Sequence, residues 1–279
     1  MKPALERLHA KASDWKVTIE ETRETPSSLL GFGVRADARV VLKITKASGD
    51  ESHSGKVLRA YAGDGAVKIY ESETDAVLLE RLEPGTDLVD LVRRGSDEEA
   101  TRILAQVIGK LAHHEPPPEC PTVADWGRGF DRYLDSGDQQ IPLELVHDAR
   151  NVYQDLSSTQ RTTMLLHGDL QHYNVLFDND RGWVAIDPKG VIGELEYELG
   201  ALLRNPGELP EFYTNPTIFN RRLEILTALL DLDHSRARAW SFAQSVLSVI
   251  WDIEDGNRST PTNLRNNSHR FYEQWVKSN

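Results

Sequence analysis

Short apolar runs of strand length, separated by turn residues, dominate the first third of the chain. Residues 35–37 predict a hairpin turn between two of these runs. The segment 51–61 differs, because Val57, Leu58 and Tyr61 follow the spacing of one helical face. The pattern predicts three strands, one helix and two strands, at 15–20, 28–34, 38–45, 51–61, 66–70 and 76–82. This order is typical of a small antiparallel sheet that carries one helix.

Helical periodicity replaces the strand pattern after the chain break at residues 83–85. Ser96 is a favourable N-cap residue for a helix that runs to about His114. Two short strands are expected at 175–177 and 183–186. Further helices are expected at 124–134, 143–156, 195–203, 216–230, 234–253 and 262–276. The change in pattern predicts an α+β fold of two lobes, a sheet lobe over residues 1–83 and a mainly helical lobe over residues 84–279.

Composition restricts the class of protein further. With 39% hydrophobic and 27% charged residues, the 279-residue chain has the balance of a globular protein. It lacks both the eighteen-residue apolar run of a membrane span and the apolar core of a signal peptide. A single cysteine fits a reducing cytoplasm. The net charge of −12 argues against nucleic acid as a partner. It suits either a cationic substrate or an acidic surface that only confers solubility.

Two acids and an amide lie at fixed offsets in the second half of the chain. Asp169 precedes Asn174 by five residues, and Asp187 follows thirteen residues later, with apolar runs beside each. Phosphoryl transfer needs such a set, in which one carboxylate receives a hydroxyl proton and oxygen ligands hold Mg²⁺. Asp169 is therefore the predicted base, and Asn174 and Asp187 are the predicted metal ligands. The alternative is two surface loops that carry these residue types by chance.

A phosphoryl donor also needs a cation on its phosphates. Lys43 is the one charge in the apolar strand 40–44, where an unpaired lysine would be costly to bury. Glu51, at the start of the next helix, can be its partner, and Asp50 is a competing choice. The alternatives are an edge lysine that points to solvent and an acid that only complements the helix dipole.

Two further segments could contact the nucleotide. Ser27 and Ser28 lie at the expected tip between the first two strands, where hydroxyls and backbone N–H groups could cradle phosphates. The carbonyl of Glu80 and the N–H of Leu82 end an apolar strand at the lobe junction, where an adenine could bind. An ordinary strand between the lobes would have the same sequence pattern.

Together these residues resemble the protein-kinase-like small-molecule kinases, in particular the aminoglycoside and hydroxyurea phosphotransferase family that includes streptomycin 6-kinases. The stretch 167–174 matches that superfamily's catalytic loop, His-Gly-Asp followed by Asn five residues after the Asp. Segments 79–86 and 182–194 look specifically like this family, and the likeness extends over about residues 27–206. The departures are from protein kinases: Gly168 replaces an Arg, Pro188 follows Asp187, and an Ala-Pro-Glu segment is missing. These departures favour a small hydroxylated acceptor.

The resemblance implies a bilobal kinase fold that uses ATP and Mg²⁺. By matching position, Lys43 resembles the phosphate-binding lysine, Glu51 its helix partner, Asp169 the base, and Asn174 and Asp187 the metal ligands.

The acceptor is expected to bind in the helical half of the chain, which is rich in acids. An aminocyclitol carries several ammonium groups that carboxylates would bind. The candidates are Glu194, Asp252 and Asp255, and the last two lie one helical turn apart. The predicted function is an ATP-dependent O-phosphotransferase that acts on a small molecule, with an aminoglycoside of streptomycin type as the first choice and antibiotic resistance as the role. A kinase of another metabolite, such as a sugar or amino sugar, and a catalytically silent nucleotide-binding pseudokinase are the alternatives.

Overall fold

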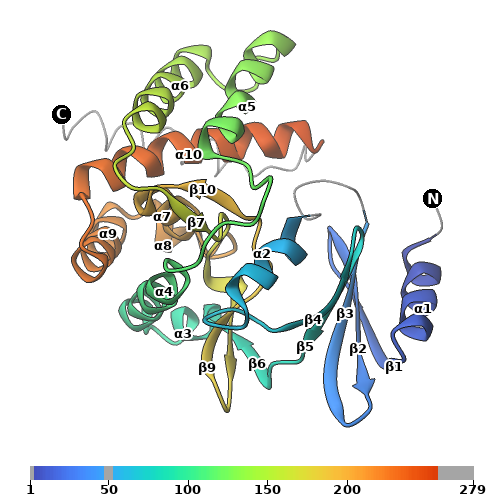
Figure 1. The fold of residues 1–279 in the computed structure, drawn as a ribbon. Helices are drawn as coiled ribbons and strands as arrows, with labels where there is room; N and C mark the ends of the chain where they lie inside the picture. The colour runs from blue at the N-terminus through green and yellow to red at the C-terminus, as the bar shows by residue number, and fades with distance from the viewer. Residues whose placement is uncertain (1–2, 47–52, 257–279) are drawn as a thin grey trace.

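The computed structural model describes residues 3–46 and 53–256, which form two lobes (Figure 1). An antiparallel sheet forms the basis of the first lobe, and the second lobe is mainly helical. The expected α+β, bilobal fold is therefore confirmed, including the order of three strands, one helix and two strands in the N-lobe. The division into residues 1–83 and 84–279 stays a prediction.

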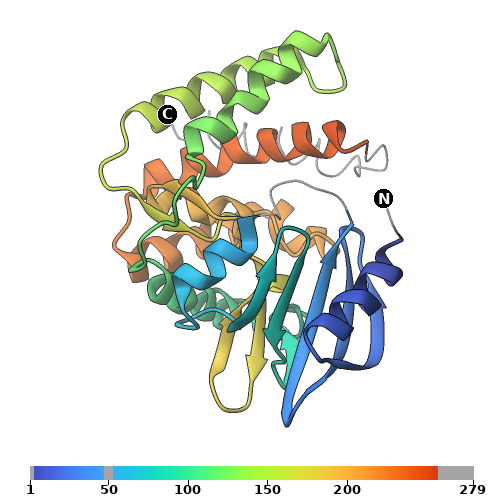
Figure 2. The same cartoon turned by 45° about the vertical axis from the view of Figure 1, so that its right-hand side comes forward.

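The N-lobe sheet has five antiparallel strands in the order β1-β2-β3-β5-β4. Their bounds are β1 (Thr18–Glu24), β2 (Ser28–Arg35), β3 (Ala38–Thr45), β4 (Ile69–Glu73) and β5 (Ala76–Glu80). In β3, Val40, Leu42 and Ile44 are buried alternately with less buried neighbours, as expected for a strand with one face on a core. Helix α1 (Ala4–Asp14) covers this face and buries Leu8 and Ala12 against it (Figure 2).

Two local expectations for the N-lobe need correction, and helix α1 was not expected. Its apolar residues recur with helical spacing and bury Leu8 and Ala12, but this pattern was not recognised in the sequence. The first strand begins at Thr18 instead of Trp15, because Lys16 has a positive φ of 56° and turns the chain there. The fourth strand begins at Ile69, because residue 66 instead pairs in parallel with Ala185 of the C-lobe.

Helix α2 (Ser54–Tyr61) connects β3 to β4 and packs beside the sheet. The start of the expected helix 51–61 lies outside the described residues. Val57, Leu58 and Tyr61, the residues that predicted this helix, are all buried. Their cluster belongs mainly to the C-lobe, so α2 links the two lobes.

The C-lobe contains the remaining described helices. They are α3 (Val89–Arg93), α4 (Asp97–Leu111), α5 (Val123–Ser136), α6 (Leu143–Ser158), α7 (Leu195–Leu203), α8 (Pro210–Thr214), α9 (Pro216–Leu230) and α10 (His234–Glu254). Helices α4, α5, α6, α7, α9 and α10 lie within three residues of the expected bounds, whereas the short helices α3 and α8 were not expected. Ser96 directly precedes α4, as predicted, but this helix ends at Leu111 and not at about His114. The expected helix at 262–276 lies outside the described residues. Within residues 3–46 and 53–256, every helix is too short or too polar to span a lipid bilayer.

Two small sheets carry the loops of interest. One pairs β7 (Met164–Leu166) with β10 (Val191–Gly193), and the other has the order β6-β8-β9. The strands of the second are β6 (Pro84–Asp87), β8 (Val175–Asp178) and β9 (Gly182–Ala185), and a 3₁₀ turn, η2 (His172–Asn174), precedes β8. The expected strands at 175–177 and 183–186 are thus present within one residue at each end.

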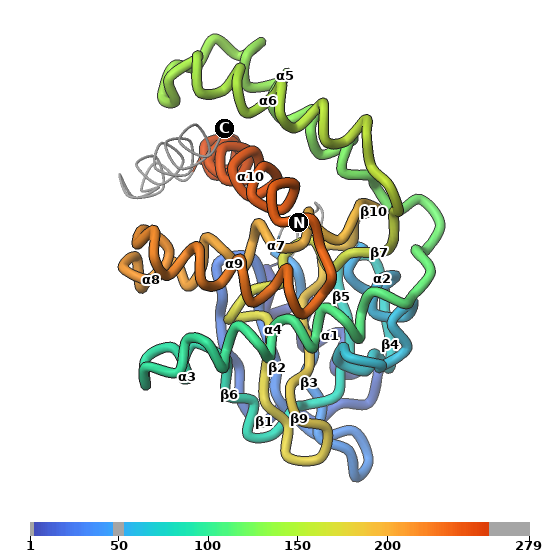
Figure 3. Tube along the Cα trace, turned by 90° about the vertical axis from the view of Figure 1, so that its left-hand side faces the viewer, coloured from blue at the N-terminus to red at the C-terminus, as the bar shows by residue number. Residues whose placement is uncertain are grey.

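Helix α10 forms the centre of the C-lobe. Figure 3 shows it between the α5–α6 pair on one side and α7 and α9 on the other. Trp240 is fully buried and meets the rings of Tyr153 and Tyr197 edge to face, each at 4.9 Å between centroids. This cluster holds α6, α7 and α10 together, and α7 in turn supports the segment described next.

Candidate active site

The segment from His167 to Asn174 follows the buried strand β7 and forms a loop at the junction of the lobes. His167 orders it from within. Its Nε2 lies 2.9 Å from the carbonyl oxygen of Ile186, and its Nδ1 accepts the Asp169 N–H at 3.3 Å. Burial lowers the pKa of His167 to about 4, so the ring is neutral and donates from Nε2. The geometry gives His167 a structural role, with its ring bonded to backbone.

Glu198 of α7 holds the same loop through hydrogen bonds to its backbone. Its buried carboxylate accepts the N–H of Gly168 at 3.1 and 3.2 Å and the N–H of Leu170 at 3.3 Å. Burial raises the pKa of Glu198 to about 7. The sequence does not reveal that Glu198 holds this loop, because the contact spans 28 residues and no local motif marks it.

Gly168 has a structural reason to be glycine. Its φ is +81°, and a Cβ atom there would lie 2.7 Å from the indole of Trp126. Neither the backbone conformation nor the space would admit the Arg that protein kinases carry at this point. The departure noted in the sequence therefore reflects an aromatic side chain that packs directly over the catalytic loop.

Asp169 and Asn174 lie side by side at the end of the loop. The Asn174 amide donates to the Asp169 carbonyl at 2.8 Å and to its carboxylate at 3.2 Å. Because Nδ2 makes both contacts, the amide oxygen points away from Asp169 and is suited to a cation. Burial raises the pKa of Asp169, although Arg204 and Lys189 act in the opposite direction.

Asp187 follows β9 and meets Lys43 of β3 across the lobe junction, with 2.5 Å between Oδ1 and Nζ. Its φ of 60° is unusual for a non-glycine residue and turns the carboxylate toward the N-lobe. Burial opposes ionisation of Asp187, but Lys43 and Lys189 outweigh it and lower the pKa. The predicted partner Glu51 and its competitor Asp50 lie outside the described residues.

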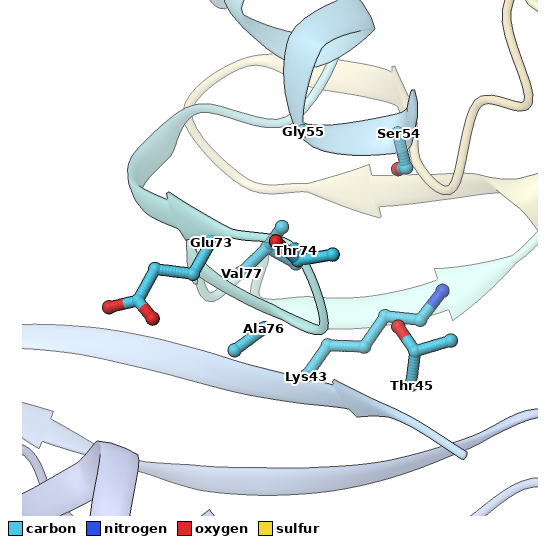
Figure 4. A pocket seen from close by; sticks show the side chains of 8 residues that line it. All are labelled: Lys43, Thr45, Ser54, Gly55, Glu73, Thr74, Ala76 and Val77. Carbon is cyan, nitrogen blue, oxygen red and sulfur yellow. The ribbon is translucent and has the colours of Figure 1, made fainter. Parts of the chain in front are cut away.

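Lys43 is partly buried and extends from β3 toward the first turn of α2, where Ser54 lies (Figure 4). The pocket beside it is also lined by Thr74 and Val77 near the β4–β5 turn. It has room for about one water molecule, so it is not the nucleotide cleft.

A short chain of hydrogen bonds connects the segments that carry the candidate residues Asp169, Asn174 and Asp187. The N–H of Ile186, next to Asp187, donates to the Asn174 carbonyl at 2.9 Å. The His167 carbonyl accepts from the N–H of Lys189 at 2.9 Å, which fixes the segment after Asp187 against the loop. Asp187 in turn acts electrostatically on Asp169. The three oxygen-bearing side chains and the Lys43 amine thus share one region.

The other candidates differ in their surroundings. Ser27 is exposed in the β1–β2 turn, whereas Ser28 is buried at the start of β2. Glu80 ends β5, and its carboxylate accepts the Lys68 N–H at 2.8 Å and pairs with Arg181. Leu82 is buried in the core cluster that both lobes share.

Of the three acids expected on the acceptor side, one approaches the catalytic loop. Asp252, in the last turn of α10, is half-buried, and Arg204 acts on its carboxyl as well as on that of Asp169. Asp255 is exposed just beyond α10. Glu194 is buried, and its carboxylate accepts from Arg236 at 2.5 Å and from the Trp240 indole, so the structure gives it a packing role.

Aromatic rings connect Asp252 to the loop. The ring of Trp251 meets Trp126 edge to face at 5.6 Å, and Trp126 packs over Gly168. The end of α10 therefore contacts the N-terminal part of α5, whose Trp126 packs against the loop that carries Asp169.

Comparison with known proteins identifies the family of the chain. The sequence model of the aminoglycoside/hydroxyurea antibiotic resistance kinase family matches residues 15–256. The chain belongs to this family. The match confirms the resemblance found in the sequence and the predicted enzyme class, a phosphotransferase with an alcohol group as acceptor.

Two curated relatives and one solved structure are similar over most of the chain. A streptomycin 3''-kinase of Klebsiella pneumoniae is 31% identical, with 80% of this chain and 83% of the relative covered. A streptomycin 6-kinase of Streptomyces griseus is 29% identical, with 84% and 78% covered. A thermostable aminoglycoside phosphotransferase APH(4)-Ia mutant, solved with AMP-PNP and hygromycin B, has a TM-score of 0.71 at 16% identity and 99% coverage of both chains. This structural likeness confirms the bilobal kinase-like fold that the sequence predicted for this chain.

Proposed function

We propose that the chain transfers the γ-phosphate of ATP to a hydroxyl of a small cationic molecule, an aminoglycoside of streptomycin type. One observation carries the proposal. Lys43 of the N-lobe contacts Asp187 of the C-lobe at 2.5 Å, and Asp169 and Asn174 are hydrogen-bonded to each other in the same region. This set provides a phosphate-binding cation, a base and two oxygen ligands. The streptomycin kinases among the relatives support the choice of acceptor.

The nucleotide would bind between the lobes. Lys43 would contact its phosphates, the exposed Ser27 hydroxyl and nearby backbone N–H groups would hold them at the β1–β2 turn, and Ser28 would order that turn from its buried position. The adenine would lie against the backbone of Glu80 and Leu82. The solved phosphotransferase of the same fold contains AMP-PNP, which supports ATP as the phosphoryl donor.

Asn174 and Asp187 would hold Mg²⁺ through oxygen. The fit is favourable, because the Asn174 oxygen points away from Asp169 and Lys43 helps to keep Asp187 ionised. Mg²⁺ usually takes one or two carboxylates and completes its shell with phosphates and water. In keeping with this, residues 3–46 and 53–256 hold no cluster of three or more His, Cys, Asp or Glu suited to a metal. When bound, the ion neutralises charge on the transferring phosphoryl group.

Asp169 would orient the acceptor hydroxyl and receive its proton. The neutral His167 and the buried Glu198 hold the loop that carries this carboxylate, so its position is set before the acceptor binds. Asp252 would bind a cationic group of the acceptor beside Trp126 and Trp251. We expect this reaction in the cytoplasm, and we expect nucleic acid and membranes to have no part in it.

The test is an ATP-consumption screen over streptomycin, other aminoglycosides, hydroxyurea, sugars and amino sugars, with mass spectrometry of each product. We expect streptomycin to gain one phosphoryl group, and NMR of the product identifies the hydroxyl. Preference for a sugar would support the kinase of another metabolite. Nucleotide binding with no consumption on any acceptor would instead support the pseudokinase.

A further inference from the structure

Arg181, in the turn between β8 and β9, extends from the C-lobe into the N-lobe. Its guanidinium donates to the carboxylate of Glu80, to the carbonyl of Gly63 and, at 2.9 Å, to the carbonyl of Ala66. The side chains of Arg181 and Glu80 are only 21% and 13% exposed. One arginine therefore joins the end of β5 and the α2–β4 connection to the C-lobe.

The rest of the β8–β9 hairpin strengthens this connection. Asp178 accepts the N–H of Glu83 at 3.0 Å, and Asn179 donates to the Glu83 carbonyl at 2.8 Å. At the other end, Ala185 donates to the Gly65 carbonyl and accepts the Val67 N–H, each at 2.8 Å. The hairpin thus forms hydrogen bonds with Glu83, directly after the segment 80–82, and with Gly65 and Val67, which precede β4.

Glu80 is held on its side chain and its backbone together. Its carboxylate accepts the Lys68 N–H at 2.8 Å, and its own N–H donates to the Lys68 carbonyl at 2.9 Å. Without Arg181, this carboxylate and two carbonyls would lose a charged donor in a largely buried position. The peptide groups that follow Glu80 would then be less firmly oriented.

We propose that Arg181 is a positioning residue for the nucleotide: it fixes the peptide groups of residues 80–82 and the angle between the lobes. The inference rests on the proposed function, which places the adenine at these peptide groups. Arg181 itself touches no reacting atom. A preorganised site binds its ligand more tightly because less ordering remains to be done on binding. Arg181 therefore acts on nucleotide affinity and leaves the chemical step unchanged.

The experiment compares Arg181→Met and Arg181→Lys with the wild-type protein. Calorimetry measures the Kd of ADP, and steady-state kinetics measure kcat and the KM values of ATP and acceptor. We expect Arg181→Met to raise the Kd of ADP and the KM of ATP roughly tenfold, with kcat and the acceptor KM within about twofold of wild type. Lysine restores only part of the affinity, because it lacks the planar fork that serves several acceptors.

Arg150→Met is the matched control, because Arg150 makes an ion pair with Asp131 between α6 and α5 at 2.7 Å, in the C-lobe. We expect this variant to bind ADP normally. Hydrogen exchange should quicken at residues 63–67 and 80–83 in Arg181→Met and not in Arg150→Met.

Several outcomes would overturn the inference. The first is unchanged ADP affinity in a folded Arg181→Met protein that retains wild-type kinetics. The second is a loss of kcat and of ADP affinity that is equal in Arg181→Met and in the control Arg150→Met, which would indicate general destabilisation. If Arg181→Met does not fold, Arg181→Lys decides the matter by the same criteria. A wild-type protein that binds no ADP would refute the proposed function itself, and the role of Arg181 with it.

Discussion

At the scale of single residues, the two carboxylates of the catalytic centre have opposite environments. Burial raises the pKa of Asp169, whereas the contact with Lys43 helps to lower the pKa of Asp187. A raised pKa suits a group that must receive a proton, and a lowered pKa suits a group that must bind a cation. These directions are compatible with the proposed roles of Asp169 as base and Asp187 as metal ligand.

Replacing Asp169 with Asn tests the base. The amide keeps the shape of the side chain and the neighbouring Asn174, but it cannot accept the hydroxyl proton. We expect kcat to fall roughly 10²- to 10⁴-fold with little change in Tm, as measured by ATP consumption and thermal unfolding. Asp37→Asn, in the exposed β2–β3 turn, is the control. Turnover close to wild type in Asp169→Asn would remove the assignment.

Glu198 makes folding stability depend on pH. Its pKa is about 7 in the folded protein and near 4.5 in the unfolded chain, so the folded state binds more protons between these values. The stabilisation is complete below about pH 4.5 and is lost as the pH rises through about 7. We expect the free energy of unfolding of wild type, relative to Glu198→Gln, to fall by up to about 3 kcal/mol between pH 4 and pH 8. Urea titrations at each pH measure the free energy of unfolding of both proteins. If the two free energies changed with pH in parallel, Glu198 would not be the source of the pH dependence.

At the scale of elements, α10 joins the core of the C-lobe to the acceptor side of the site. Trp240 in its middle packs against Tyr153 and Tyr197, while Trp251 and Asp252 at its end lie near the catalytic loop. The same helix thus supports the loop through α7 and presents an acid beside it. The two roles can be separated by one substitution in the middle of the helix and one at its C-terminal end.

Trp240→Ala removes the largest fully buried side chain of the C-lobe. We expect the free energy of unfolding to drop by roughly 3–5 kcal/mol, because the change leaves a cavity and deprives the buried Glu194 carboxylate of a donor. Chemical denaturation measures the loss. Leu229→Ala, at a residue 52% exposed on α9, should change stability by less than about 0.5 kcal/mol. Equal effects of the two variants would show that Trp240 does not organise the core.

Asp252→Asn tests the acceptor side. We expect the KM of streptomycin to rise roughly tenfold while the KM of ATP stays the same, because a partly buried carboxylate that pairs with a cation contributes more than an exposed one. Asp255→Asn should have a smaller effect, since Asp255 is exposed and its charge is screened. Glu144→Gln, exposed on α6, is the control. If Asp255→Asn raised the acceptor KM more than Asp252→Asn, the cation would bind beyond the end of α10.

Several elements could be predicted at both ends, and the bounds expected for β3, α7 and α9 agree with the structure. Strand β3 alternates buried and less buried residues, α7 is an apolar segment that is buried on nearly all sides, and α9 begins at a proline. Helix α1 was not predicted, although its apolar residues recur with helical spacing. Asp169 and Asn174 could be proposed as site residues because one short motif carries both of them. Glu198 and Arg181 could not, because both act through contacts far apart in the chain.

At the scale of the whole molecule, two of the contacts between the lobes differ in their chemistry. The β8–β9 hairpin joins the lobes through backbone bonds and Arg181. The pair Lys43–Asp187 joins them at the catalytic centre, where both groups have other proposed partners. When Mg²⁺ and nucleotide bind, Asp187 would turn to the metal and Lys43 to the phosphates. Metal and nucleotide should therefore stabilise the folded protein together.

Thermal unfolding with ADP, with and without Mg²⁺, tests this coupling without any turnover. A ligand at about 100 times its Kd stabilises a protein by about 2.7 kcal/mol, so tighter binding of Mg-ADP should raise the Tm of wild type above its value with ADP alone. In Asp187→Asn and Asn174→Ala we expect this Mg²⁺-dependent increment to disappear while the shift caused by ADP remains. Asp37→Asn should keep both shifts. A full increment in Asp187→Asn would mean that the Asp187 carboxylate is not needed to hold the metal, and the assignment of this ligand would fail.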